Sequence, residues 1–162
     1  MATRSKSVNG ACLVDLERGL VDRRVFADPE LYRLEQERVF ARCWLLLGHE
    51  SEIPHPGDYV SVYMGENPVL LCRDGNGRLR AFLNMCRHRG NRVCRLDRGN
   101  SPSFECSYHG WTFSNEGTLI GIPMPQHYAD LDRDSWGLIP VAQLDTHRGL
   151  ISPPSKIGRA HV

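Results

Sequence analysis

The chain has 162 residues, with 20 lysines and arginines against 19 acidic residues, and its net charge of +1 leaves no bulk positive charge for a nucleic-acid surface. No apolar run is long enough to cross a membrane, and the N-terminus lacks the apolar stretch of a secretory signal. Six cysteines are too few for a disulfide scaffold, so a reducing cytoplasmic location is expected, where grouped cysteines and histidines favour metal binding.

The first part of the chain contains one predicted helix. Residues 1–27 show no clear periodicity and are interpreted as an N-terminal arm. A short helix is predicted over 28–42, because Asp28 suits the N-cap and Pro29 the first helical position. Glu30 then places a negative charge near the positive end of the helix dipole.

From residue 43 onward the hydrophobic pattern has a period of two, which predicts a β domain over 43–151. A hairpin is expected around 74–77 and a second turn at 115–117, because glycine and asparagine gather there between β-rich runs. Strands are also expected in "CWLLLG" and over 138–144. The predicted fold class is mainly β: a small antiparallel β-sandwich with two ligand-bearing loops, preceded by a short α-helix.

Two short cysteine–histidine pairs stand out, Cys86-x-His88 and Cys106-x-x-His109, and each histidine is followed by a glycine. Two cysteines and two histidines suit a structural zinc ion. They also suit a Rieske [2Fe–2S] cluster, in which two histidines replace two cysteines on one iron. Unrelated core residues are the third interpretation.

The order of the residues favours the cluster. Each loop carries the cysteine first, so two equivalent loops can bracket a flat cluster, with both cysteines on the inner iron and both histidines on the outer one. Gly90 and Gly110 permit tight loops, in which backbone N–H groups come close to sulfur.

The segment "NMCRHRGNRVC…FECSYHGWTFSNEGTL" resembles the Rieske segment of the large (alpha) subunits of bacterial aromatic ring-hydroxylating dioxygenases. The flanking "CWLLLGHESEIPHPGDYVSVYMGENPVLLCRDGNGRLRAFLN" and "WGLIPVAQLDTHRGLI" resemble the same family. The resemblance implies that Cys86 and Cys106 ligate one iron, and that His88 and His109 ligate the other. It also implies that electrons pass from a ferredoxin or reductase, through the cluster, to a separate mononuclear iron.

Residues around these ligands are expected to support the cluster. Arg87 and Arg89 are interpreted as docking or hydrogen-bonding groups beside His88, or as solvated loop cations. Tyr108 is expected to direct its hydroxyl toward the cluster, and Trp111 to lie under its loop. High-potential Rieske proteins, by contrast, carry a pattern similar to C-T-H-L-G-C…C-P-C-H-G-S.

Asn91, Tyr108 and Trp111 stand in place of the two extra cysteines and the serine of that high-potential pattern. Fewer donors to the cluster leave its reduced state less stabilised. A redox titration is therefore expected to give a potential near the low end of the roughly −150 to +300 mV Rieske range, and a value well above zero would contradict this.

A complete relative would continue into a catalytic domain that holds mononuclear non-haem Fe(II) through a D-x-x-H-x-x-x-x-H motif, and would assemble with a beta subunit as a trimer or an α₃β₃ complex. That motif is absent here, so no catalytic residue is assigned and the chain is expected to be catalytically incompetent by itself. A free-standing Rieske ferredoxin is the alternative. Residues 152–162 are expected to be a non-native tail, because 156–162 match one reading frame of a common sequencing adapter.

Overall fold

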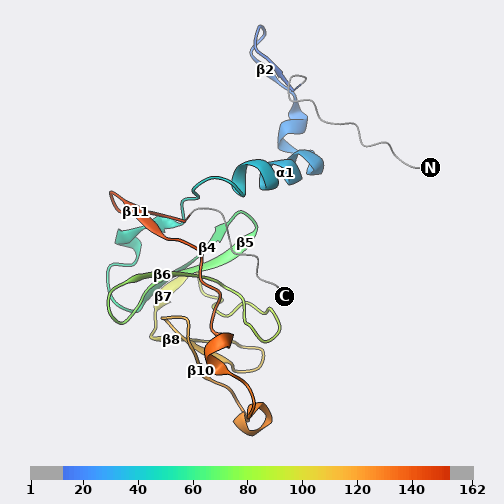
Figure 1. The fold of residues 1–162 in the computed structure, drawn as a ribbon. Coiled ribbons are helices and arrows are strands. Elements are labelled where there is room, and N and C mark those ends of the chain that lie inside the picture. Colours follow the sequence, from blue (N-terminus) through green and yellow to red (C-terminus); the bar gives the residue numbers. More distant parts are fainter. Residues whose placement is uncertain (1–12, 154–162) are drawn as a thin grey trace, which may run out of the picture. The chain divides into compact units, whose positions relative to one another are not determined.

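The computed structural model describes residues 13–153 and contains two compact units, Met1–Arg42 and Cys43–Val162 (Figure 1). Residues 1–12 of the expected N-terminal arm and residues 154–162, which make up most of the expected tail, lie outside the described residues. No helix in the described part of the chain is long and apolar enough to cross a membrane.

The first unit contains the predicted helix. Helix α1 spans Pro29–Glu35 and continues as a π-helical turn, η3, over Gln36–Phe40. Asp28 caps the helix, because its carboxylate accepts the Glu30 N–H at 2.9 Å. A small hairpin of β1 (Val14–Asp15) and β2 (Leu20–Val21), then a 3-10 turn, η2 (Arg23–Phe26), precede it. Strands of two residues are too short to leave a visible alternation in the sequence.

The second unit contains three antiparallel sheets. The central sheet has the order β6-β5-β4-β7, with β4 at Asp58–Met64, β5 at Asn67–Arg73, β6 at Leu79–Leu83 and β7 at Arg98–Asn100. The second sheet, β10-β9-β8, contains Leu119–Gly121, Thr112–Ser114 and Ser103–Glu105. The third sheet, β11-β12-β3, contains Asp145–His147, Leu150–Ser152 and Gly48–His49. Three 3-10 turns are η4 (Glu50–Glu52), η5 (Pro125–Tyr128) and η6 (Arg133–Trp136).

The central sheet is buried on both faces, which places it between two cores. On β5, Leu70 belongs to a core shared with Phe113 of the second sheet. The next residue, Leu71, belongs to a core shared with Ile151 of the third sheet. This two-sided burial explains why β5 is a continuous apolar run rather than an alternating one.

The predicted hairpin between β5 and β6 is confirmed, and a buried carboxylate stabilises its turn. Asp74 is fully buried and accepts the N–H groups of Asn76 and Arg78 at 2.9 Å each. Its second oxygen accepts from Nε of Arg80, also at 2.9 Å. Burial tends to raise the pKa of Asp74, but these hydrogen bonds and the Arg80 charge hold it below the usual value.

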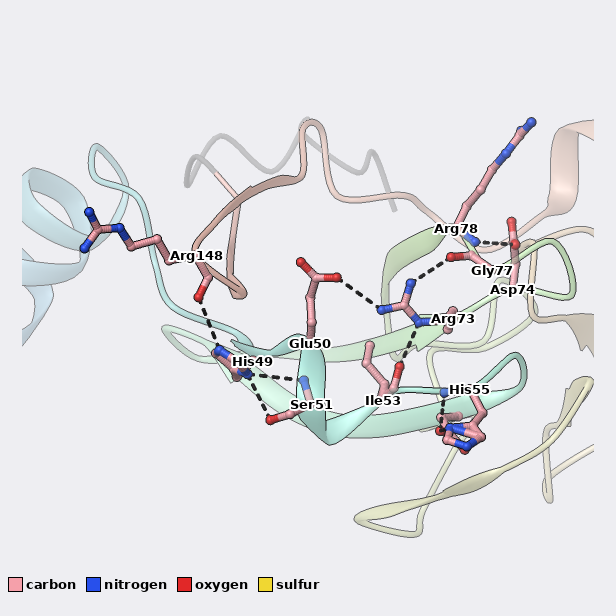
Figure 2. A network of polar contacts seen from close by, with 11 residues as sticks. His49, Glu50, Ser51, Ile53, His55, Arg73, Asp74, Gly77, Arg78 and Arg148 are labelled. Carbon is pink, nitrogen blue, oxygen red and sulfur yellow. Dashed lines mark hydrogen bonds and ion pairs between the residues drawn. The ribbon is translucent and has the colours of Figure 1, made fainter.

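A second arginine connects this hairpin to the turn η4 (Figure 2). Arg73 donates from Nε to the Ile53 carbonyl at 2.8 Å and from a terminal nitrogen to the Gly77 carbonyl at 2.8 Å. Its other terminal nitrogen lies 3.4 Å from the Glu50 carboxylate. One half-buried guanidinium thus holds together three chain segments.

Two of the expected strands are largely absent. Over 138–144 the structure has only an isolated bridge from Pro140 to Phe82, and the strand begins at Asp145. Two backbone hydrogen bonds flank this bridge, from the Leu83 N–H to the Ile139 carbonyl and from the Val141 N–H to the Ala81 carbonyl, at 2.9 Å each. In "CWLLLG" only its last residue, Gly48, lies in a regular strand, β3, although Leu47 still donates its N–H to the Ile151 carbonyl at 2.9 Å.

Candidate metal centre

The two cysteine–histidine segments fold into the same five-residue turn. Each turn opens on a cysteine and closes on a glycine four residues later. Gly90 donates its N–H to the Cys86 carbonyl at 2.9 Å, and Gly110 donates to the Cys106 carbonyl at 2.8 Å. Both glycines have positive φ, +71° and +69°, a conformation that other residues adopt only at a cost. The N–H of each glycine therefore closes its own turn.

A second hydrogen bond fixes the base of each turn. The N–H of Cys86 donates to the Asn91 carbonyl at 2.8 Å, and that of Cys106 donates to the Trp111 carbonyl at 2.8 Å. The first turn follows strand β6, and the second joins β8 to β9. The two turns are thus equivalent in backbone structure, although the histidine is at the third position in one and at the fourth in the other.

These turns bring the four candidate ligands together as a pair of thiols and a pair of imidazoles. Cys86 and Cys106 are 4% and 1% exposed, and their thiols lie within hydrogen-bonding reach of each other. The ring centres of His88 and His109 are 4.7 Å apart. His88 is half-buried, whereas His109 is exposed.

An unsatisfied atom in this group fits a bound metal. Nδ1 of His88 is buried and has no hydrogen-bond partner among the described residues. Such a group is costly in a folded protein unless something coordinates it. In the described part of the chain no three candidate ligands surround a single ion position. A [2Fe–2S] cluster needs only two protein ligands on each iron, so the arrangement fits such a cluster.

Backbone N–H groups point at both sulfurs. Burial raises the pKa of Cys86 to about 11, although the N–H groups of His88 and Arg89 oppose this. Burial also acts to raise the pKa of Cys106. There the Asn91 side chain and the Tyr108 N–H outweigh burial, so the net pKa is lowered. Thiolate sulfurs are the form that binds iron, and these donors stabilise it.

Asn91 and Tyr108 contact the centre in different ways. Nδ2 of Asn91 lies 3.5 Å from Sγ of Cys106 and donates to it. Tyr108 is 58% exposed, and its ring lies 3.8 Å from the His109 ring, tilted by 32°. The contact that the structure gives Tyr108 is therefore between rings, and its hydroxyl has no hydrogen-bond partner in the described part of the chain.

Behind His88 lies a group of aromatic side chains. The buried Trp111 ring stacks on His88, with 4.9 Å between the centres and 4° between the planes. Tyr128 and Trp136, from the turns η5 and η6, pack edge-on against Trp111 at 5.7 and 5.8 Å. Arg87 places its guanidinium 5.6 Å from the centre of the Trp136 ring.

A buried amide closes the longer loop at its base. Asn84 donates from Nδ2 to the Cys94 carbonyl at 2.8 Å, and its Oδ1 accepts the Cys94 N–H at 2.8 Å. The side chain thus replaces a missing backbone ladder across residues 84–94. Both residues are buried, so this closure holds the first turn in place.

The model of the Rieske [2Fe–2S] domain family matches residues 43–143, which include both turns. The chain belongs to this family. Its Rieske domain begins at the boundary between the two compact units.

The relatives of this Rieske chain are oxygenase subunits. It is 49% identical over 140 residues to biphenyl 2,3-dioxygenase subunit alpha of Rhodococcus jostii (strain RHA1), covering 86% of the chain and 30% of the relative. It is also 49% identical over 140 residues to benzene 1,2-dioxygenase subunit alpha of Pseudomonas putida, covering 86% and 31%. The crystal structure of naphthalene 1,2-dioxygenase from Rhodococcus sp. bound to indole matches with a TM-score of 0.78 and 44% identity, over 83% of the chain and 31% of that structure. The chain thus spans about 30% of the length of these relatives.

Sequence reasoning did not find every residue that surrounds this Rieske centre. Tyr128, Trp136 and Asn84 were not selected, because single aromatic residues and one asparagine have no spacing that indicates a site. The available signal was weak: two aromatic residues in a proline-rich connection with no strand pattern, and one asparagine between strand β6 and Cys86.

Proposed function

We propose that Cys86 and Cys106 hold one iron of a Rieske [2Fe–2S] cluster, and that His88 and His109 hold the other. The single observation that carries this proposal is the convergence of two matching turns, with their thiols side by side and the Nδ1 of His88 unpartnered. When bound, such a cluster takes up and gives away one electron at a time.

The surrounding residues have supporting roles in this proposal. Gly90 and Gly110 set the turns, and Trp111 fixes the plane of the His88 ring. Tyr108 packs on His109. Because His109 is the exposed histidine, its ring is the accessible edge of the centre. Arg87 and Arg89 flank His88.

The wider function that we propose is electron delivery in an aromatic ring-hydroxylating dioxygenase. In this proposal a ferredoxin or reductase supplies electrons, and the chain passes them to mononuclear iron in a separate catalytic domain. A beta subunit, a trimeric or α₃β₃ assembly and a cytoplasmic location belong to the same proposal. The relatives' names and the shared Rieske domain support it.

A chimera tests this function. Residues 43–151 replace the matching segment of the Rhodococcus jostii biphenyl 2,3-dioxygenase alpha subunit, and the product formed from biphenyl is measured with that enzyme's own electron donors. We expect turnover within about tenfold of the parent, because the segment supplies the electron relay only. The same chimera with His109→Ala is expected to form no product.

The cluster content of each chimera shows whether a loss of product comes from a missing cluster or from failed electron delivery. Iron, sulfide and electron paramagnetic resonance are measured on each chimera before the assay. A chimera that carries the reduced-cluster signal but forms no product would contradict the oxygenase proposal and favour the electron-carrier interpretation. A chimera without any cluster would contradict the ligand assignment.

A further inference from the structure

Positive charge is concentrated around the two turns. Residues 86–110, which contain both turns, carry five arginines against Asp97 and Glu105, whereas the whole chain has a net charge of only +1. The five are Arg87, Arg89, Arg92, Arg95 and Arg98. None of them forms an ion pair within the described part of the chain. No carboxylate in this part of the chain therefore neutralises their charge.

Two of these arginines are already held in place by aromatic rings. Arg87 lies over Trp136, and Arg92 lies over Tyr63 with 5.4 Å between its guanidinium carbon and the ring centre. Arg92 also donates to the Tyr63 hydroxyl. Side chains that are held this way lose less conformational entropy when a partner binds, because part of their freedom is already lost.

Two other arginines are exposed, and each lies beside one of the turns. Arg89 follows His88 directly and is part of the first turn. Arg95 lines a surface cavity of about 240 Å³ together with Ser107, which is the second residue of the other turn. Glu105 lines the same cavity, so the surface is predominantly rather than purely basic.

We propose that the surface around Arg89 and Arg95, beside the two turns, is the docking site of an acidic electron-transfer protein that reduces the cluster. The proposal rests on the function proposed above, and adds to it the chemistry that selects the donor. Electrostatic attraction raises the rate of encounter with an acidic partner and orients it toward Arg89 and Arg95, beside the two turns. Electron transfer requires close approach and quick release, which a charged and weakly apolar contact provides.

The test compares two double variants with equal loss of charge. Arg89→Gln/Arg95→Gln removes the two exposed arginines beside the turns. Arg78→Gln/Arg148→Gln removes two exposed arginines elsewhere, because Arg78 is at the hairpin end of β6 and Arg148 is in the turn before β12. Each reconstituted chain is mixed anaerobically with a reduced, strongly acidic plant-type [2Fe–2S] ferredoxin, whose potential lies below the Rieske range. The rate of cluster reduction is followed by stopped-flow absorbance at several salt concentrations.

We expect Arg89→Gln/Arg95→Gln to slow this reduction by about three- to tenfold at low salt and to flatten its salt dependence, while the control pair stays within about twofold of the parent chain. Photoreduced deazaflavin, an uncharged reductant, should reduce all three chains at the same rate. Equal slowing by both pairs, or no slowing by either, would overturn the docking proposal while leaving the electron relay intact. A parent chain that neither reductant reduces would overturn both proposals.

Discussion

Asn91 shows what one side chain does near a thiolate. It occupies the position where high-potential Rieske proteins carry a cysteine, and its Nδ2 donates to Sγ of Cys106. A donor to sulfur stabilises the more negative, reduced state, so Asn91→Ala is expected to lower the reduction potential. With about 1 kcal/mol for the hydrogen bond and 59 mV per tenfold change, the shift is about 40 mV. Protein-film voltammetry measures it, and Asn67→Ala, at the start of β5, is the control. An unchanged or raised potential would contradict the role of this contact.

The four candidate ligands were predictable at this scale, because cysteine and histidine at short, repeated spacings are rare outside metal sites. The support around His88 was not. Its contacts with Trp111 and, through that ring, with Trp136 depend on where η6 packs, and no local pattern encodes that position. The sequence comparison also treated Asn91 only as the loss of a cysteine, whereas the structure shows that it supplies a hydrogen-bond donor.

The two turns have the same backbone conformation but different surroundings. Substitution of their glycines therefore separates the cost of the backbone conformation from the cost of a steric overlap. A Cβ on Gly90 meets no atom within 4 Å, whereas one on Gly110 lies 2.8 Å from Cγ of Pro123. Both substitutions carry the left-handed backbone cost of about 1–2 kcal/mol. Gly110→Ala adds the overlap with Pro123, so it is expected to destabilise the protein by about 1–3 kcal/mol more than Gly90→Ala. Urea unfolding and iron content measure the difference.

A rescue variant tests the cause of that difference. Pro123→Ala in the Gly110→Ala background removes the clashing ring, and it is expected to recover most of the additional loss once the effect of Pro123→Ala alone is subtracted. If the two glycine variants are equally stable, the Pro123 contact has no energetic role.

Stability in acid is a property of the whole β unit, and Asp74 contributes to it. Its pKa in the folded protein is below the unfolded value of about 3.9, so it stabilises the fold above that pH, and the contribution is lost as the pH falls through the folded pKa. Asp74→Asn is expected to lower the free energy of unfolding by about 2 kcal/mol at neutral pH, and by less as the pH falls below about 4. Urea unfolding across this range checks it, with the exposed Asp130→Asn as the control. A pH-independent difference would show that the carboxylate charge is not involved.

For the whole molecule, sequence patterns predicted the antiparallel β class and both hairpin turns, because asparagine and glycine readily adopt the backbone conformations that tight turns require. They did not predict three sheets with the central one buried on both faces. The continuous apolar run of β5 has no period that tells which residue faces which core. Residues 138–144 show the same limit, since their apolar pattern predicts a strand but the structure has only an isolated bridge there.

Electron paramagnetic resonance of the reduced protein, with nitrogen hyperfine couplings resolved by ENDOR, tests the central claim most directly. Two cysteines and two histidines around a [2Fe–2S] cluster predict two irons and two sulfides per chain and couplings from two distinct histidine nitrogens. A colourless protein that holds one zinc per chain, or a cluster signal without histidine nitrogen couplings, would contradict the account.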